Sequence, residues 1–281
     1  MSASGPRLGA TTTRYRMDLQ YDGQGFFGWA RQSGIVTVQS ALEAALGTVL
    51  GMVPTLSVAG RTDTGVHARR QVVSLDLPDM GPQGPLDPFR LMGSLNALTP
   101  PGLAVVALAA ARPGFDARRD ATSRSYRYLI TPGPVQSPFR RAYAWHVGYP
   151  LDVVAMAAAS RTVLGRHDFT AFTPAESERA AFVRTVDRCS WRLRGDLLWL
   201  EVRATSFLRH MVRSLVGTMV EVGRGRLEVA DMERFLQGAP RSTAGPTAPP
   251  HGLFLWRVTY ADESEMRTWS TPEEELGGCA P

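Results

Sequence analysis

The sequence contains no lysine, so all 31 of its basic residues are arginine. A guanidinium group carries a planar set of donors that suits phosphate, and it also stacks on nucleobases. Codon usage in a genome rich in G and C is the better explanation of the missing lysine, but it does not explain where the charges lie. Residues 261–281 hold six acids and one arginine, which leaves thirty arginines against twenty acids in residues 1–260, a formal charge of +10. The strong positive charge of residues 1–260 favours a polyanionic partner.

Long apolar runs are also missing, and cysteine is rare. No segment has about 18 consecutive apolar residues, and no charged start precedes an apolar run, so we expect neither a membrane span nor a signal peptide. Cys189 and Cys279 have no metal-ligand spacing and make no disulfide framework, which is typical of a cytoplasmic protein. Cys189 lies in a strand-like run, where we expect a small buried side chain. His67 and His167 have no set of metal-ligating neighbours, so we predict structural hydrogen bonds for both and no bound metal.

The spacing of apolar residues predicts an α+β fold. At 281 residues, with 44% hydrophobic and 20% charged residues, the chain suits one large domain or two of ordinary size. Strand, helix, strand, strand, helix and strand follow one another between residues 14 and 110, which is the ferredoxin-like order. The second half repeats this rhythm. We predict two antiparallel lobes at residues 14–114 and 115–260, a disordered N-terminus at 1–13 and an acidic flexible tail at 261–281.

Residues 59–68, Ala-Gly-Arg-Thr-Asp-Thr-Gly-Val-His-Ala, form a loop between two strand-like runs. Gly60 and Gly65 permit backbone angles and close approaches that other residues resist. Between them stands Asp63, and Arg61 two residues earlier would favour its ionised form. An ionised carboxylate can act as a nucleophile or base towards an electrophilic carbon. The alternative is that Asp63 and Gly65 only shape a turn.

Arginine and tyrosine alternate along the predicted strand at residues 121–130. We expect one face of this strand to carry cations and the other aromatic rings. Such a surface suits a nucleic acid, because arginine contacts phosphate and the rings stack on bases. The alternative is a half-exposed strand whose tyrosines pack inward.

A helix is predicted to begin at Ser206, which is a good N-cap. Its buried stripe is expected to consist of Phe207, Met211, Leu215 and Val216. Arg209 and Arg213 are four residues apart and would share one helix face. For an isolated arginine pair, a solvated edge is the ordinary outcome.

Several of these stretches resemble the TruA-type tRNA pseudouridine synthases. The loop resembles G-R-T-D-A-G-V-H-A, with Thr64 in place of the usual Ala. Residues 21–29 resemble Y-D-G-x-x-F-x-G-W, residues 115–128 resemble F-x-A-R followed by R-x-Y-x-Y, and residues 207–217 resemble F-L-x-x-M-V-R-x-x-V-G. The common order of the motifs, from about residue 14 to residue 260, makes the resemblance specific.

The resemblance implies a function and roles for particular residues. It implies that Asp63 is catalytic, that Tyr126 contacts the substrate, and that Arg213 faces the aspartate, with Arg61 as a further substrate-binding residue. It also implies RRM-like lobes with a cleft between them, and a homodimer whose tRNA touches both subunits. The expected substrates are uridines at positions 38, 39 and 40 of the anticodon arm. No cofactor is expected, because the isomerisation involves no net redox change.

Two other functions remain open from the sequence. An RNA-binding module without catalysis is possible because ferredoxin-like sheets bind single strands. Such a module has no need of Asp63 inside a basic cleft, where a carboxylate repels phosphate. A glycosidase-like enzyme would need two carboxylates in partnership, whereas the motifs offer one carboxylate matched to arginines, so this alternative ranks last.

Overall fold

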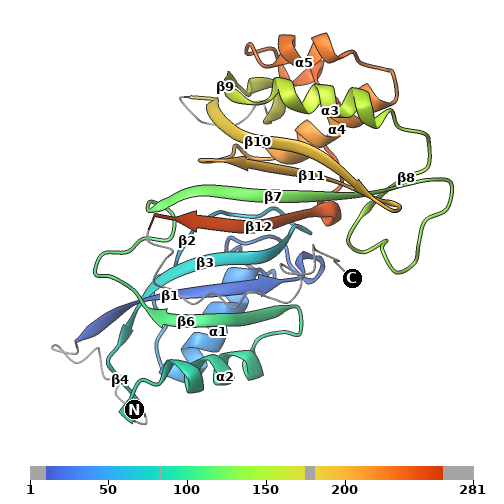
Figure 1. The fold of residues 1–281 in the computed structure, drawn as a ribbon. Helices are drawn as coiled ribbons and strands as arrows, with labels where there is room; N and C mark the ends of the chain where they lie inside the picture. The colour runs from blue at the N-terminus through green and yellow to red at the C-terminus, as the bar shows by residue number, and fades with distance from the viewer. Residues whose placement is uncertain (1–10, 83, 175–180, 262–281) are drawn as a thin grey trace.

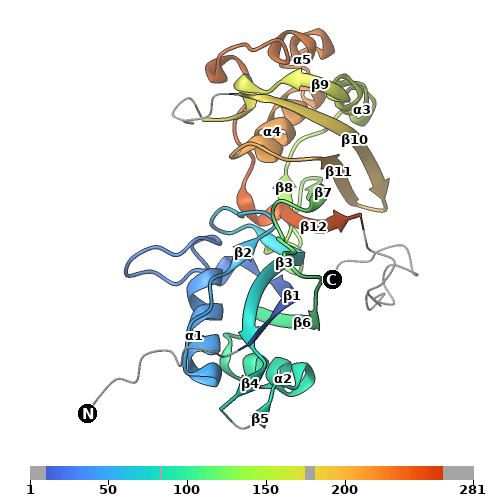
Figure 2. The same ribbon diagram turned by 90° about the vertical axis from the view of Figure 1, so that its left-hand side faces the viewer.

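The strands of the first half of the chain form one part of the sheet, with both helices of this half on one face (Figures 1 and 2). In this computed structural model, residues 11–82, 84–174 and 181–261 are described. The elements of the first half are β1 (Thr12–Tyr21), α1 (Val38–Leu50), β2 (Ser57–Val58), β3 (His67–Pro78), β4 (Met80–Gly81), β5 (Gly84–Pro85), α2 (Pro88–Leu98) and β6 (Leu103–Ala110). The antiparallel order β6–β1–β3–β2 is the predicted ferredoxin-like arrangement, and β4 and β5 form a separate small hairpin.

The second half repeats the same arrangement. Its elements are β7 (Ala121–Pro132), β8 (Trp145–Val147), α3 (Val153–Thr162), β9 (Gly165–Asp168), β10 (Val183–Arg194), β11 (Leu197–Ala204), α4 (Met211–Gly223), α5 (Val229–Phe235) and β12 (Leu253–Tyr260). The order β12–β7–β11–β10 matches that of the first half, with β9 added outside β10 and β8 parallel to β7. The repeated rhythm of the sequence is therefore confirmed as a repeated topology.

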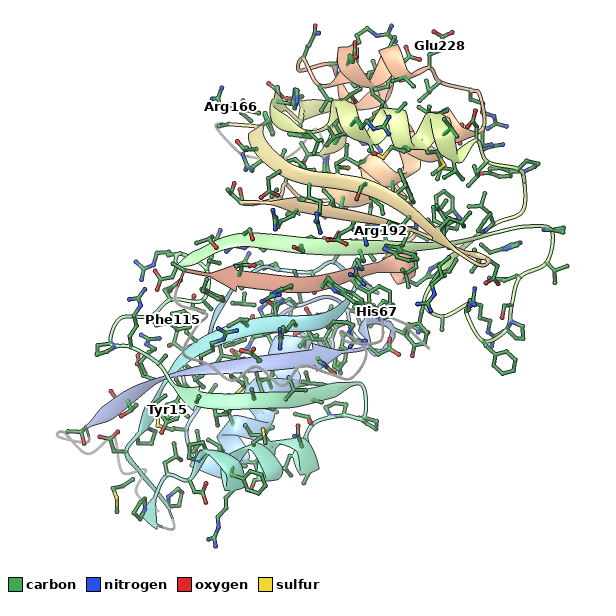
Figure 3. All side chains as sticks on the ribbon, in the orientation of Figure 1. Tyr15, His67, Phe115, Arg166, Arg192 and Glu228 are labelled. Atoms are coloured by element: carbon green, nitrogen blue, oxygen red, sulfur yellow. The ribbon has the colours of Figure 1, made fainter. Side chains whose placement is uncertain are left out.

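The two halves share one sheet rather than two. β12 pairs antiparallel with β7, and it also pairs in parallel with the start of β3, where Phe254 and Leu255 lie opposite His67 and Ala68. Figure 3 labels His67 at this junction. β2 covers β3 only at Ser74 and the residue before it, so the start of β3 is an open edge that β12 fills. The α+β class is confirmed, but the lobes are joined by a parallel pair that the sequence did not predict.

Side-chain caps define where three of the helices begin. The Thr37 hydroxyl accepts from the Ser40 N–H at 3.2 Å, and the Ser40 hydroxyl accepts from the Thr37 N–H at 2.9 Å. The carboxylates of Asp87 and Asp152 cap α2 and α3 by accepting from main-chain N–H groups of the first turn. Each such cap stabilises its helix by about 1 kcal/mol. These caps fix the first residues of α1, α2 and α3 at Val38, Pro88 and Val153.

The helix predicted from Ser206 begins five residues later, at Met211. His210 has a left-handed backbone with φ 60, so the helix cannot extend back through it. Arg209 therefore lies outside α4 and is exposed, and the shared helix face predicted for Arg209 and Arg213 is wrong. Of the predicted stripe, Phe207 precedes the helix, and the residues buried on α4 are Met211, Leu215 and Val216.

The predicted boundary between the N-terminal segment and the first strand is partly wrong. Thr12 and Thr13 belong to β1, because they pair with the end of β3, and so they are not part of a disordered N-terminus. The rest of that segment and nearly all of the predicted acidic tail lie outside the described residues. Cys189 is buried and free, as predicted. None of the helices that the structure describes has the length and apolar character needed to span a bilayer.

Candidate active site

Asp63 lies in the loop between β2 and β3, and neighbouring segments hold the backbone of this loop. The Trp29 N–H donates to the Thr62 carbonyl at 3.0 Å, and the Thr62 and Tyr21 hydroxyls hydrogen-bond at 2.8 Å. At Gly28, with φ 83, an added Cβ would lie 2.9 Å from the Thr62 carbonyl oxygen, a clash that glycine avoids. The loop is held in place while the Asp63 side chain remains 31% exposed.

Arg213, from α4 of the second half, faces Asp63. Its Nη1 lies 3.4 Å from Asp63 Oδ2, and its Nε donates to the Ala248 carbonyl at 2.7 Å. The Arg213 side chain is only 14% exposed, so it is not on a solvated edge. The structure brings together the two residues that the resemblance pairs, although 150 positions separate them in the sequence.

A close approach of the chain to α4 fixes the guanidinium of Arg213. Gly217 has no side chain, and a Cβ there would lie 1.7 Å from the Pro246 carbonyl oxygen. The segment after Pro246 therefore runs directly along α4, and the Ala248 N–H donates to the Arg213 carbonyl at 3.1 Å. The Ala248 carbonyl is thereby placed to accept from Arg213 and to direct the guanidinium towards the catalytic loop.

Tyr126, on β7, is buried beneath the same loop. Its hydroxyl lies 3.7 Å from the position that a Cβ on Gly60 would occupy. Burial raises the pKa of the Tyr126 phenol far above its ordinary value, and the nearby Tyr21 and Asp63 raise it further. Arg124 acts in the opposite direction and is the smallest of these effects. The phenol is therefore neutral and protonated near the carboxylate.

The expected separation of cations from aromatic rings on β7 is wrong. Arg124, Tyr126 and Tyr128 are two residues apart from one another, so their side chains share one face of the strand. All three are buried, and the inward packing of the two tyrosines agrees with the alternative. Arg127 lies on the opposite face, 3.9 Å from the ring centroid of Trp256. The buried Arg124 donates to the main-chain carbonyls of Ala59, Arg118, Ala121 and Thr205.

Arg61 is not brought to the carboxylate. Its side chain is exposed, and it makes no hydrogen bond or ion pair with any residue that the structure describes. The alternation of side chains along the loop directs Arg61 outward while Thr62 points into the protein. Arg213, rather than Arg61, is the arginine that faces Asp63.

The two histidines singled out in the sequence make structural hydrogen bonds, as predicted. His67 Nδ1 accepts from the Gly23 N–H at 3.0 Å, which leaves Nε2–H to donate to the His251 carbonyl at 3.0 Å. Burial lowers the pKa of His67, which keeps this ring neutral. His167 Nε2 contacts the Leu164 carbonyl at 2.7 Å. In residues 11–82, 84–174 and 181–261, no group of three His, Cys, Asp or Glu side chains is arranged to hold a metal ion.

His210 is a site residue that the sequence did not reveal. Its Nε2 lies 3.5 Å from Asp63 Oδ2, and its side chain is 25% exposed. The predicted helix from Ser206 placed His210 inside regular structure, with no reason to turn towards Asp63. The available signal was weak: histidine is one of the few residues enriched at left-handed positions.

Known proteins with similar sequences identify the class. A family model described as tRNA pseudouridine synthase matches residues 159–261. Three curated relatives carry the name tRNA pseudouridine synthase A. The protein from Methylobacterium sp. (strain 4-46) is 43% identical, covering 89% of this chain and 98% of its own. The protein from Acidiphilium cryptum is 43% identical, covering 88% of this chain and 96% of its own. The protein from Myxococcus xanthus is 41% identical, covering 91% of this chain and 95% of its own.

Each of these relatives matches at least 88% of this chain, so the similarity spans both halves of the fold. The chain is therefore a pseudouridine synthase by class. More specifically, it belongs to the tRNA pseudouridine synthase A family.

Proposed function

We propose that the chain converts uridine to pseudouridine at positions 38, 39 and 40 of the tRNA anticodon arm, with Asp63 as the catalytic residue. Conversion of tRNA uridine is the activity named for its relatives. The positions follow from the resemblance of the motifs. The observation that carries the assignment of Asp63 is its pairing with Arg213 across the two halves of the fold.

The reaction breaks the N1–C1′ bond of uridine, turns the base, and forms a C5–C1′ bond while C5 loses its proton. A uridine within a stem must first leave its stack, which costs a few kcal/mol. Asp63 Oδ2 faces Arg213, and no described residue donates a hydrogen bond to Oδ1. The free oxygen is the one that we assign to the reacting ribose or base.

The other site residues are assigned by their charge and exposure. Arg213 contacts the carboxylate of Asp63 and fixes its orientation. Tyr126 contacts the base through its ring, and the raised pKa of its phenol argues against a role as the base that removes the C5 proton. The exposed guanidinium of Arg61, in the catalytic loop itself, is suited to a phosphate of the substrate.

Release of tritium from C5-labelled uridine in unmodified tRNA tests this function. The chain is expected to release tritium from tRNA with uridine at positions 38, 39 or 40, and not from matched transcripts with cytidine there. Absence of release from every tRNA would favour the RNA-binding module without catalysis. Equal release from the cytidine-substituted transcripts would contradict the assigned positions.

The resemblance also supports a proposal for assembly and location. We infer two lobes that divide near residue 115, the first beginning with β1 at Thr12, and that supply Asp63 and Arg213 to a cleft between them. We further infer a cytoplasmic homodimer in which one tRNA contacts both subunits. Sedimentation of the chain alone and with tRNA checks the assembly: a monomer in both samples would contradict it.

Binding of tRNA is expected to weaken steeply as salt rises. The reason is the formal charge of +10 over residues 1–260, carried by arginine alone. Each phosphate neutralised should change the slope of log affinity against log salt by roughly 0.7–0.9. Filter binding over a salt series measures this slope. A flat response would indicate that the arginines reflect codon usage and do not contact RNA.

A further inference from the structure

The backbone of His210 is fixed in a left-handed conformation by contacts on both sides. The Leu208 carbonyl accepts from the N–H of Met211 at 3.3 Å, and the Arg209 carbonyl accepts from the Thr173 hydroxyl at 3.1 Å. The His210 carbonyl accepts from the N–H of Ser214, in the first turn of α4, at 2.9 Å. Conformations of this kind persist only where the surrounding structure imposes them, and they cluster at functional sites.

The imidazole of His210 is not needed for this backbone conformation. It makes no capping hydrogen bond to α4, although His210 stands at the N-cap position. Glycine would adopt φ 60 with less strain, and asparagine and aspartate also tolerate left-handed backbone angles. Among the described residues, His210 is the only one other than glycine with a positive φ. The side chain therefore requires an explanation outside the helix.

The imidazole and the guanidinium of Arg213 approach the same oxygen of Asp63. His210 Nε2 is 3.5 Å from Oδ2, and Arg213 Nη1 is 3.4 Å from it. No described residue donates to Oδ1. One carboxylate oxygen is thus flanked by two donors, and the other remains open. Contacts of this length are common in a site without substrate and shorten in the reacting complex.

Burial, with the help of neighbouring arginines, lowers the pKa of His210 and keeps the imidazole neutral near pH 7. Burial is the main cause of its lowered pKa. Asp63 acts in the opposite direction, whereas the neighbouring Arg213, Arg209 and Arg241 lower the pKa further. Since Asp63 is an acceptor, the neutral ring faces it favourably with its proton on Nε2. A neutral donor orients a carboxylate without the full neutralisation that a second cation would bring.

We propose that His210 is a positioning residue for Asp63: its Nε2–H and the Arg213 guanidinium hold Oδ2, so that Oδ1 is directed to the substrate. This role rests on the proposed catalytic function of Asp63. It requires both the side chain and the left-handed backbone, because a helical residue at this position would project along α4.

Two substitutions separate the side chain from the backbone. His210→Gly accepts the φ of this position and removes the imidazole, whereas His210→Gln keeps a neutral N–H donor at about the distance of Nε2. His167→Gln, at a histidine on β9 with a structural hydrogen bond, is the matched control. For each variant we would measure the melting temperature, tRNA affinity, the single-turnover rate of pseudouridine formation and its pH dependence.

His210→Gly is expected to fold and to bind tRNA within about threefold of the parent, but to react roughly ten- to a hundredfold more slowly. The acidic limb of its pH–rate profile should move to higher pH, because the ionised carboxylate has lost a donor. His210→Gln should recover a large part of the rate and return the limb towards that of the parent. His167→Gln should match the parent.

Other outcomes would overturn the positioning role. A His210→Gly rate within threefold of the parent would show that the imidazole does not act on Asp63. A loss confined to tRNA affinity would assign His210 to RNA contact instead. If His210→Gly loses rate only in proportion to a lowered melting temperature, and its acidic limb does not shift, His210 contributes to stability alone. If His210→Gln does not fold, the rate and pH profile of His210→Gly decide the question. An inactive parent protein would instead contradict the proposed function.

Discussion

Replacing Asp63 with asparagine is expected to reduce pseudouridine formation below detection while leaving the protein folded and able to bind tRNA. The amide is nearly the same size as the carboxylate, and the main-chain contacts that hold the loop do not involve the Asp63 side chain. Asparagine cannot act as a carboxylate nucleophile or base, so the chemistry should stop. Affinity for tRNA should be unchanged or modestly higher, because a negative charge has been removed near a polyanion.

Tritium release, filter binding and thermal melting on one preparation check this result. Asp76→Asn is the matched control, because this carboxylate is half exposed and pairs with Arg14 along β1 and β3. The control should keep its activity at saturating tRNA. If Asp63 only shapes a turn, Asp63→Asn should be nearly as active as the parent, since asparagine also suits turns. Residual turnover within about tenfold of the parent would contradict the catalytic role.

The catalytic loop was predictable because its signal is local. Asp63, Gly65 and the flanking strands stand within a short stretch, and glycine and alternation report on local backbone geometry. The order of helices and strands between residues 14 and 110 was also predicted from the spacing of apolar residues. The pairing of Arg213 with Asp63 came from the resemblance, since spacing alone favoured a solvated edge.

The features that the sequence did not predict depend on contacts between distant segments. The parallel pairing of β12 with β3 fills an edge that exists only because β2 is two residues long. A helix beginning at Ser206 satisfied local capping preferences. Because His210 has a left-handed backbone, α4 begins only at Met211. Neither the left-handed turn nor its approach to Asp63 is marked by a pattern in the neighbouring residues, so His210 was identified only from the structure.

Replacing Arg213 with alanine is expected to slow turnover by about a hundredfold, with a smaller effect on tRNA affinity. The guanidinium is a charged donor to Asp63, and interactions with charged partners typically contribute about 1.5–3 kcal/mol, which corresponds to roughly ten- to a hundredfold in rate. The acidic limb of the pH–rate profile should move to higher pH, because the ionised carboxylate loses its positive neighbour. The Ala248 carbonyl also loses its donor, so the melting temperature should fall.

Arg213→Lys separates the positive charge from the geometry of the guanidinium. One ammonium group has the charge but lacks the planar fork that reaches Ala248 and Asp63 together at 2.7 Å and 3.4 Å. We therefore expect Arg213→Lys to return the acidic limb towards that of the parent while recovering only part of the rate. Arg234→Ala, at an exposed arginine on α5 paired with Asp231, should leave turnover at saturating tRNA unchanged. If Arg213→Ala instead keeps the parental turnover and acidic limb and loses only melting temperature, Arg213 serves to anchor the segment at Ala248 and does not act on Asp63.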